Sequence, residues 1–262
     1  MFTISSRQNA LVVRCRAIAR GEDSARILLD GAHLVSEALA SGLAIQQAIV
    51  STAHAGDAEI AAIVHELERR QVEMVAARPP VMAAVSLLRS PSAVVAVAAR
   101  PVASTDGRPS RQALLVLACD VQDPGNLGAI VRVAEAAGAT GMVAAGQSAD
   151  PFGSKALRGS MGSALRLPIA MRSTIDESVA DARRQGCRIA AAIPRGGTLL
   201  YDADLRGPLA VLVGSEGSGL ADAVIRDADL QLTIPMQPPV ESLNAAVTVA
   251  IVLYEARRQN QK

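Results

Sequence analysis

Aromatic side chains are almost absent from this chain of 262 residues, which has no tryptophan, two phenylalanines and two tyrosines. Half of the residues are nevertheless hydrophobic, so the core must be built from alanine, valine, leucine and isoleucine. A chain of this length can form one large domain or two smaller ones. The scarcity of rings also leaves few positions at which a ligand could stack on the protein.

Cysteine and histidine are scarce too, with three of each. The cysteines are odd in number, widely spaced and free of any Cys-x-x-Cys pattern, so we expect buried thiols in a reducing cytoplasm rather than disulfides. The histidines all fall in the N-terminal third without ligand-like spacing, so we expect no metal site and no catalytic histidine. The residues concerned are Cys15, Cys119, Cys187, His33, His54 and His65.

Long apolar runs are missing as well. The first ten residues are polar, and no stretch approaches the roughly 18 apolar residues that a membrane span needs. We therefore expect neither a signal peptide nor a membrane anchor, and a cytoplasmic protein.

Lysine accounts for only two of the 26 basic residues, and the arginines are unevenly placed. The net charge of +1 argues weakly against a nucleic-acid ligand, but the distribution matters more than the sum. Arginine forks match the geometry of phosphate groups, although such clusters can also be ordinary solvated faces. Two stretches are basic without any acid: Arg7, Arg14, Arg16 and Arg20 before Glu22, and Lys155, Arg158, Arg166 and Arg172 between Asp150 and Asp176.

A polar segment with two prolines and a glycine, residues 101–111, lacks apolar periodicity and indicates a linker. It separates an N-terminal module, 1–100, from a C-terminal module, 112–262. The N-terminal module alternates helix and strand patterns, which predicts a small α/β domain. Its expected helices are 6–19, 33–40 and 57–70, and its expected strands are 27–29, 45–50 and 94–98.

The C-terminal module alternates apolar strand patterns with helix patterns, which predicts a parallel sheet covered on both faces. Its expected strands are 113–118, 141–145, 188–193, 209–213 and 230–234, and its expected helices are 127–137, 173–185, 220–227 and 243–258. Ligands of such sheets bind at the carboxyl ends of the strands, so the loops there are the candidate sites.

Three of these loops contain polar or glycine-rich segments. In the first, Asn126 is a plausible N-cap, and Arg132 follows nearly two turns into the helix. In the second, residues 214–220, three glycines allow a close backbone approach, and Glu216 would repel a phosphate but suits a ligand with hydroxyl, amino or cationic groups. In the third, three prolines stiffen the loop, Ser242 is a plausible N-cap, and Asn244 would then lie in the first turn.

Other nucleotide-binding patterns do not fit. The second loop lacks the Gly-Lys-Ser/Thr of a nucleoside triphosphate site. No Gly-x-Gly-x-x-Gly follows the opening strand, which argues against a nicotinamide cofactor, and no Gly-x-Ser-x-Gly elbow occurs. A dehydrogenase or a kinase is thereby disfavoured.

Taken together and in this order, the three segments resemble the SpoU/TrmH family of RNA 2′-O-methyltransferases, of the SPOUT class. Asn126, Gly128 and Arg132 match its Asn-x-Gly-x-x-x-Arg motif, and Gly214, Glu216 and Gly219 match its Gly-x-Glu-x-x-Gly loop. The third motif is matched by Ile234 to Met236 and by Ser242 to Asn244. Segments 155–163 and 29–35 are similar to other parts of the family, and Asp30 stands where the family often has glutamate.

The resemblance implies an α/β fold whose C-terminal parallel sheet carries a deep trefoil knot, an exception to the rule against threaded chains. It implies S-adenosyl-L-methionine as cofactor, and a homodimer formed by the C-terminal domain with an active site completed across the interface. The residues expected to contact the cofactor are Gly214, Gly219, Ile234, Met236 and Leu243.

The resemblance also assigns the chemistry. A ribose 2′-hydroxyl is a very weak acid, so its methylation needs a group that takes or shares the proton. Arg132 is the family's candidate, but arginine is effectively always protonated and is a poor base, so an RNA phosphate is an alternative proton acceptor. Hydrogen bonds from the remaining catalytic candidates would build the pocket around it: Asn126, Glu216, Ser242 and Asn244.

A 2′-hydroxyl distinguishes RNA from DNA, so the expected substrate is RNA, read by shape and phosphate contacts through the arginine-rich N-terminal module. A large recognition module favours structured 23S ribosomal RNA, with transfer RNA as the alternative. A non-catalytic RNA-binding protein of the same fold also stays open, and the sequence does not identify the nucleotide or the biological role of its methylation.

Overall fold

The computed structural model describes residues 1–102 and 113–261, and the chain divides into two units. Unit 1 comprises Met1–Pro101 with Phe152–Arg166, and unit 2 comprises Val102–Pro151 with Leu167–Lys262. Most of the expected linker, 101–111, lies outside the described residues. The segment Phe152–Arg166, which the sequence boundary puts in the C-terminal module, packs within unit 1.

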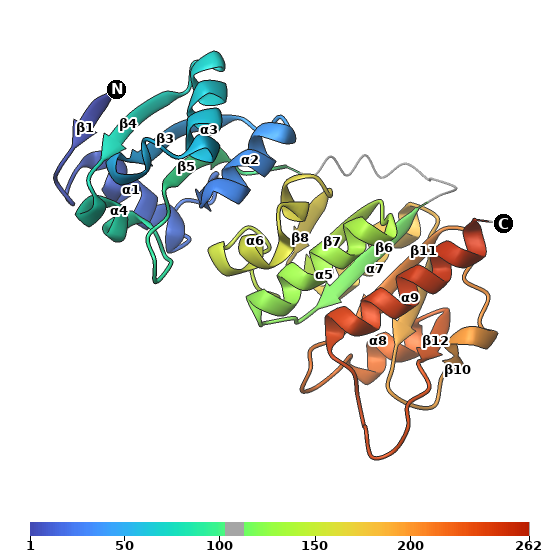
Figure 1. Cartoon of the computed structure of the whole chain (residues 1–262). Helices are drawn as coiled ribbons and strands as arrows, with labels where there is room; N and C mark the ends of the chain where they lie inside the picture. The colour runs from blue at the N-terminus through green and yellow to red at the C-terminus, as the bar shows by residue number, and fades with distance from the viewer. Residues whose placement is uncertain (103–112, 262) are drawn as a thin grey trace. The chain divides into compact units, whose positions relative to one another are not determined.

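Unit 1 contains a mixed five-stranded sheet in the order β1-β4-β3-β5-β2 (Figure 1). β1, β3 and β4 pair in parallel, whereas β5 runs antiparallel to both β3 and β2. The strands are β1 (Phe2–Ile4), β2 (Arg26–Asp30), β3 (Ile45–Ser51), β4 (Glu73–Ala77) and β5 (Val94–Ala99). β1 and β4 were not expected from the sequence, because β1 is short and the run 73–77 shows little apolar alternation.

Helices cover both faces of this sheet. α1 (Ala10–Ala19) and α4 (Pro79–Val85) share a buried cluster with one face, and α2 (Ala32–Ala40) packs on β2, β5 and α3 (Ala58–Arg69). α6 (Ser154–Ser160) contacts β2. Three short 3-10 helices complete the described chain: Thr52–His54 and Ser163–Leu165 in unit 1, and Leu200–Asp202 in unit 2.

The expected helix 6–19 begins only at Ala10, which corrects its N-terminal boundary. The Asn9 side chain accepts a hydrogen bond from the Leu11 amide at 2.9 Å and caps the helix. Ser6 instead accepts a bond from the Gln8 amide in the turn before it, since short polar side chains compete with helical backbone bonds.

Unit 2 contains a seven-stranded sheet in the order β10-β12-β9-β11-β6-β7-β8, and every recorded strand pair is parallel (Figure 1). The expected parallel sheet is confirmed. Its strands are β6 (Leu114–Cys119), β7 (Gly141–Ala145), β8 (Ile169–Arg172), β9 (Arg188–Ala192), β10 (Thr198–Leu199), β11 (Leu209–Val213) and β12 (Leu230–Thr233).

Two helices lie on each face of this sheet. α7 (Ile175–Arg184) and α8 (Asp222–Asp227) pack apolar residues against one face, those of α8 being only partly buried, and α5 (Pro124–Ala137) packs with α9 (Ala245–Asn260) on the other. The near-continuous burial of β6, β7 and β11 follows from this double cover. Within the described residues, no helix is long and apolar enough to cross a membrane.

Candidate active site

The three polar loops follow strands β6, β11 and β12, and all of them leave the same edge of the parallel sheet. β6 and β11 are direct neighbours, and β12 is separated from β11 by β9 alone. Because the carboxyl ends of parallel strands meet at one edge, segments up to 118 residues apart in sequence come together there.

The first loop leads into α5, which begins at Pro124 with Asp123 as its N-cap. The Asp123 carboxylate accepts a hydrogen bond from the Asn126 amide at 2.9 Å, so the prediction that Asn126 caps this helix is wrong. Proline is favoured at the first helical position, which places the cap before it. The Asn126 side chain is therefore free of capping and available to the site.

Arg132 lies one turn beyond Gly128 on α5, and its side chain is exposed. Across the part of the chain that the structure describes, its guanidinium has no hydrogen-bond or ion-pair partner. An arginine fork left open in this way can bind an anion or a polarised oxygen of a ligand.

The third loop ends at Asn244, which is the N-cap of α9. Its side-chain oxygen accepts hydrogen bonds from the amides of Ala246 and Val247, at 2.9 and 3.4 Å. The prediction that Ser242 caps this helix and that Asn244 lies in its first turn is thus wrong. Both residue types favour the cap position, and the backbone of Asn244 adopts the non-helical conformation that a cap requires.

Asn244 also joins the other two loops. Its side-chain nitrogen donates to Asn126 Oδ1 at 3.1 Å and to Glu216 Oε1 at 2.5 Å. A side-chain amide has two N–H donors and one oxygen with two lone pairs, so Asn244 is fully satisfied. Among the described residues, the side-chain nitrogen of Asn126 (Nδ2) and the second carboxylate oxygen of Glu216 (Oε2) have no partner and stay available to a ligand.

The second loop, 214–219, folds back so closely that only glycine fits at its start. A Cβ atom on Gly214 would lie 2.2 Å from the carbonyl carbon of Gly219 and 2.5 Å from the Leu220 nitrogen. Gly219 itself has φ +66°, in the left-handed region that favours glycine. The loop is held by Ser215 and Ser218, whose hydroxyls lie 2.8 Å apart.

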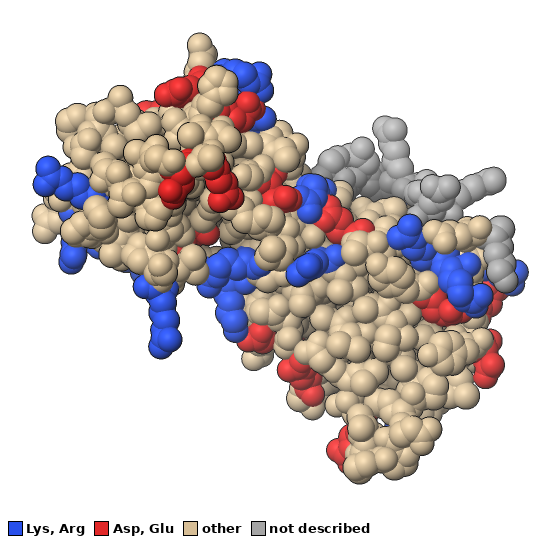
Figure 2. Space-filling view, viewed as in Figure 1, with Lys and Arg blue, Asp and Glu red and all other residues tan. Residues whose placement is uncertain are grey.

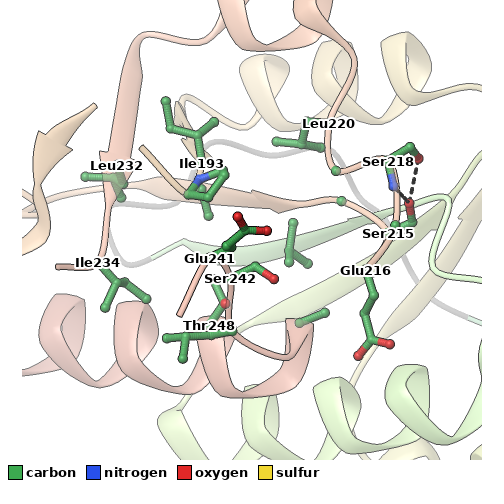
Figure 3. A pocket seen from close by; sticks show the side chains of 18 of the residues that line it. Ile193, Ser215, Glu216, Ser218, Leu220, Leu232, Ile234, Glu241, Ser242 and Thr248 are labelled. Atoms are coloured by element: carbon green, nitrogen blue, oxygen red, sulfur yellow. Dashed lines mark hydrogen bonds between the residues drawn. The ribbon is translucent and has the colours of Figure 1, made fainter. Parts of the chain in front are cut away.

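A cavity of about 470 Å³ lies between this loop, the end of β12 and the start of α9 (Figure 3). This volume is within the range of small-molecule sites. All five residues expected to contact the cofactor line the cavity, as does Ser242: they are Gly214, Gly219, Ile234, Met236 and Leu243.

Figure 3 shows Ile193, Leu232 and Ile234 at one end of this cavity and Ser215 and Ser218 at the other. Glu241 and Ser242 lie between them, whereas Glu216 points away from Ser218 and Leu220. The sequence interpretation missed Glu241 and Thr248, which also line the cavity. Glu241 directly precedes the Ser-Leu-Asn segment, so the motif could have identified it as a candidate. Thr248 lies in the first turn of α9, and only the position of this helix beside the cavity identifies it.

A second cavity, of about 560 Å³, shares residues 215–218 with the first. It is lined by Asn126 together with Asp120, Gln122 and Gln147. The loop 215–218 thus borders both cavities, and the side chain of Asn126 belongs to the second. The arrangement can hold two ligands next to each other.

The three cysteines are buried and free, as expected. Burial raises the pKa of the Cys119 thiol to about 12, and the charge of Asp120 acts in the same direction. A thiol in this state is a poor nucleophile, so Cys119 carries no covalent chemistry at the end of β6. Among the described residues, no group of three histidine, cysteine, aspartate or glutamate side chains could hold a metal ion.

Comparison with known proteins identifies residues 113–254 as a match to the model of the SpoU rRNA Methylase family. A relative from Synechocystis, described as an uncharacterized tRNA/rRNA methyltransferase, is 33% identical over 98% of this chain and 94% of its own length. A 23S rRNA (guanosine(2553)-2'-O)-methyltransferase of Bacillus subtilis is 31% identical over 88% of both chains.

Solved structures with the same architecture include an AdoMet-bound rRNA methyltransferase from Sinorhizobium meliloti, with a TM-score of 0.86 and 28% identity over 98% of this chain and 97% of that one. The SpoU methyltransferase AviRb from Streptomyces viridochromogenes, in complex with AdoMet, has a TM-score of 0.84 and 30% identity. That match covers 96% of this chain and 98% of AviRb.

Proposed function

The chain belongs to the SpoU rRNA methylase family, and from this premise we propose that it transfers a methyl group from S-adenosyl-L-methionine to a ribose 2′-hydroxyl of structured 23S ribosomal RNA in the cytoplasm. The activity of the Bacillus subtilis relative supports this choice of target. The observation that carries the proposal is the hydrogen-bonded cluster of Asn126, Asn244 and Glu216 between two adjoining cavities.

The first cavity fits the cofactor. Gly214 gives a ligand access to backbone groups where any side chain would block the loop, and Ile234, Met236 and Leu243 supply apolar surface for a ring. Glu241 places a carboxylate beside these groups, which suits a ligand that carries amino and hydroxyl groups. When bound, S-adenosyl-L-methionine supplies an electrophilic methyl group.

The second cavity would receive the target nucleotide. The side-chain nitrogen of Asn126, Nδ2, has no hydrogen-bond partner among the described residues and would donate to a ribose oxygen. Asn244 acts as a positioning residue, since its cap bonds orient its amide and its amide orients Asn126 and Glu216. Holding the hydroxyl in line with the methyl donor can supply a large part of the rate.

Arg132 would act on the hydroxyl itself. Its open guanidinium would donate to the 2′-oxygen and stabilise the negative charge that develops as the proton leaves. A phosphate of the RNA is the better proton acceptor, because arginine stays protonated. Glu216, Gly219 and Ser242 would complete the walls of the site.

The finer architecture is also part of the proposal. After β12 the chain runs through the proline-rich loop and into α9, which packs on both β11 and α5, and this path is consistent with a trefoil knot. Val247 and Tyr254, two turns apart on α9, are 46% and 51% exposed and would bury themselves in a homodimer. Unit 1 would bind the RNA, and the segment 101–111 would link it to the catalytic domain.

The test is transfer of radiolabelled methyl from S-adenosyl-L-methionine to RNA of cells that lack this protein, followed by alkaline digestion. A 2′-O-methyl group blocks cleavage at the neighbouring phosphate, so we expect label in an alkali-resistant dinucleotide from 23S rRNA. Arg132→Ala should abolish the label, whereas Arg226→Ala, an exposed arginine on α8 at the other face of the sheet, should keep it.

Label on a base would contradict the ribose assignment, and label in transfer RNA would correct the target. No label with any RNA, despite intact binding of S-adenosyl-L-methionine, would favour the non-catalytic alternative.

A further inference from the structure

Unit 1 has a surface poor in negative charge, formed by α4, the part of α1 that contacts it and the segments beside them. Residues 1–21 and 74–105 contain no aspartate or glutamate. Figure 2 shows blue side chains along the lower left margin of this unit, near where Figure 1 places α4, and red side chains farther toward its middle. The same two stretches hold seven arginines: Arg7, Arg14, Arg16, Arg20, Arg78, Arg89 and Arg100.

Two of these arginines are held in place by α4. Arg7 donates through Nε to the carbonyl of Pro80 at 3.2 Å, and Arg16 donates through Nε to the carbonyl of Ala84 at 2.8 Å. A bond through Nε leaves the terminal nitrogens of the fork available, and within the described ranges neither fork meets a carboxylate. The two guanidiniums are therefore oriented in advance without being neutralised.

Arg78 directly precedes α4 in the sequence, Arg89 lies in the loop that follows it, and both are exposed. Neither has a hydrogen-bond or ion-pair partner in the part of the chain that is described. Other arginines of the same unit differ, since Arg20 pairs with Glu22 at 2.5 Å and Arg69 with Glu66 at 2.7 Å. Uncompensated positive charge is thus concentrated next to α4.

The loop that carries Arg89 is held by hydrogen bonds to a buried carboxylate. Asp30, only 4% exposed, accepts hydrogen bonds from the Leu87 amide at 2.7 Å and from the Ser86 hydroxyl at 3.2 Å. The Ser86 oxygen in turn accepts from the Leu88 and Ser92 amides. A loop tied to a buried carboxylate loses little further freedom when Arg89 binds a ligand.

We propose that the α1–α4 face, defined by Arg7, Arg16, Arg78 and Arg89, binds the phosphate backbone of the RNA substrate. The inference rests on the proposed function and specifies where unit 1 contacts the RNA. Arginine forks match phosphate geometry, and four arginines that meet no carboxylate in the described residues give the face the complementary charge. Arg7 and Arg78 lie at the start of α4 and Arg16 and Arg89 at or beyond its end, so the pairs contact different phosphates of one RNA.

The test compares two double variants with equal loss of charge. Arg7→Ala with Arg78→Ala removes two exposed groups of the face, whereas Arg69→Ala with Arg184→Ala removes two exposed arginines that are paired with Glu66 and Asp181. Filter binding of protein-free 23S rRNA from cells lacking the enzyme is measured over a series of KCl concentrations. Melting temperature and binding of S-adenosyl-L-methionine establish that each variant is folded.

The face variant should bind the rRNA about tenfold more weakly at physiological salt, and its salt slope should fall by about 1.5 because each lost phosphate contact contributes about 0.7 to 0.9. The paired-arginine variant should keep the wild-type slope. Arg16→Lys should weaken binding with little change of slope, since it keeps the charge and loses the fork.

An unchanged salt slope in the face variant, or an equal loss in both double variants, would overturn the α1–α4 face as the RNA contact, whatever the methylation assay shows. Conversely, a wild-type protein that binds RNA through this face and transfers no methyl group would refute the proposed function and leave the face in place. In the active enzyme, the face variant should raise KM for the RNA and leave kcat at saturating RNA unchanged.

Discussion

The sharpest prediction concerns Gly214, at the point where β11 enters its loop. The substitution Gly214→Ala would place a Cβ atom 2.2 Å from the carbonyl carbon and 2.3 Å from the carbonyl oxygen of Gly219. The three nearest atoms all belong to backbone, so rotation of a side chain cannot relieve the overlap. The loop 214–219 must therefore open by more than an ångström, and this loop lines the proposed cofactor cavity.

The expected magnitude follows from the cost of forcing a methyl group into packed structure, about 1–3 kcal/mol. If the loop opens to relieve the overlap, that free energy is lost from cofactor binding, which corresponds to an affinity about 5- to 150-fold weaker. Titration calorimetry with S-adenosyl-L-methionine measures the change directly, and a thermal melt shows how much of the cost falls on the fold instead.

Gly217→Ala is the matched control, because Gly217 lies in the same loop without a positive φ, and a Cβ atom added there would meet no heavy atom within 4 Å. It should bind the cofactor as the wild type does. Wild-type affinity and melting temperature in Gly214→Ala, or an equal loss in Gly217→Ala, would refute the argument that close backbone approach at Gly214 shapes the cavity.

Three further outcomes are expected. Asn244→Ala should lower the free energy of unfolding by about 1 kcal/mol through loss of the α9 cap and should also abolish methyl transfer. Asn244→Asp should keep the cap and the melting temperature but lose activity, because it places a carboxylate against Glu216. A fully active aspartate variant would contradict the positioning role. Tyr254→Asp on α9 should convert a dimer to a monomer in light scattering, and an unchanged mass would argue against this helix as the interface. The buried thiols should not react rapidly with a disulfide reagent at pH 8 until the protein is unfolded. Burial raises the thiol pKa to about 12 for Cys15, about 12 for Cys119 and about 11 for Cys187. The stability that the thiols contribute is therefore full below the unfolded thiol pKa of about 8.5 and is lost as the pH rises through the folded values.

Much of the fold of unit 2 could be predicted from local pattern. The apolar runs 113–118, 141–145 and 209–213 were expected as buried parallel strands, and β6, β7 and β11 lie in the sheet at or within one residue of these bounds. β8 and β10 were not among the expected strands, and the two residues of β10 are too few to show any periodicity. Helix starts were displaced by two to four residues where a proline or a second capping residue was present.

The candidate site shows the same division at the level of single residues. The types and spacing of Asn126, Glu216 and Asn244 were sufficient to single them out as candidates. The sequence did not show which residue caps each helix, because four side chains near the two helix starts can all cap and the backbone angles decide between them. The four are Asp123 and Asn126 at α5, and Ser242 and Asn244 at α9. Asn244 could be assigned as a positioning residue only once both acceptors of its side-chain nitrogen, Asn126 and Glu216, were known.

By itself, the sequence determined the parallel sheet, the three polar loops at its carboxyl edge and the family, because strand runs, turn glycines and motif spacings are local properties of the chain. Only the tertiary structure decided that Asn244 bonds to residues 118 and 28 positions away, that segment 152–166 packs within unit 1, and that Arg7 and Arg16 dock on α4 about 70 residues later. The physical reason is that a hydrogen bond between distant residues depends on how strands are ordered in a sheet and helices are laid on it, and strand order is a global result of packing that no local pattern encodes.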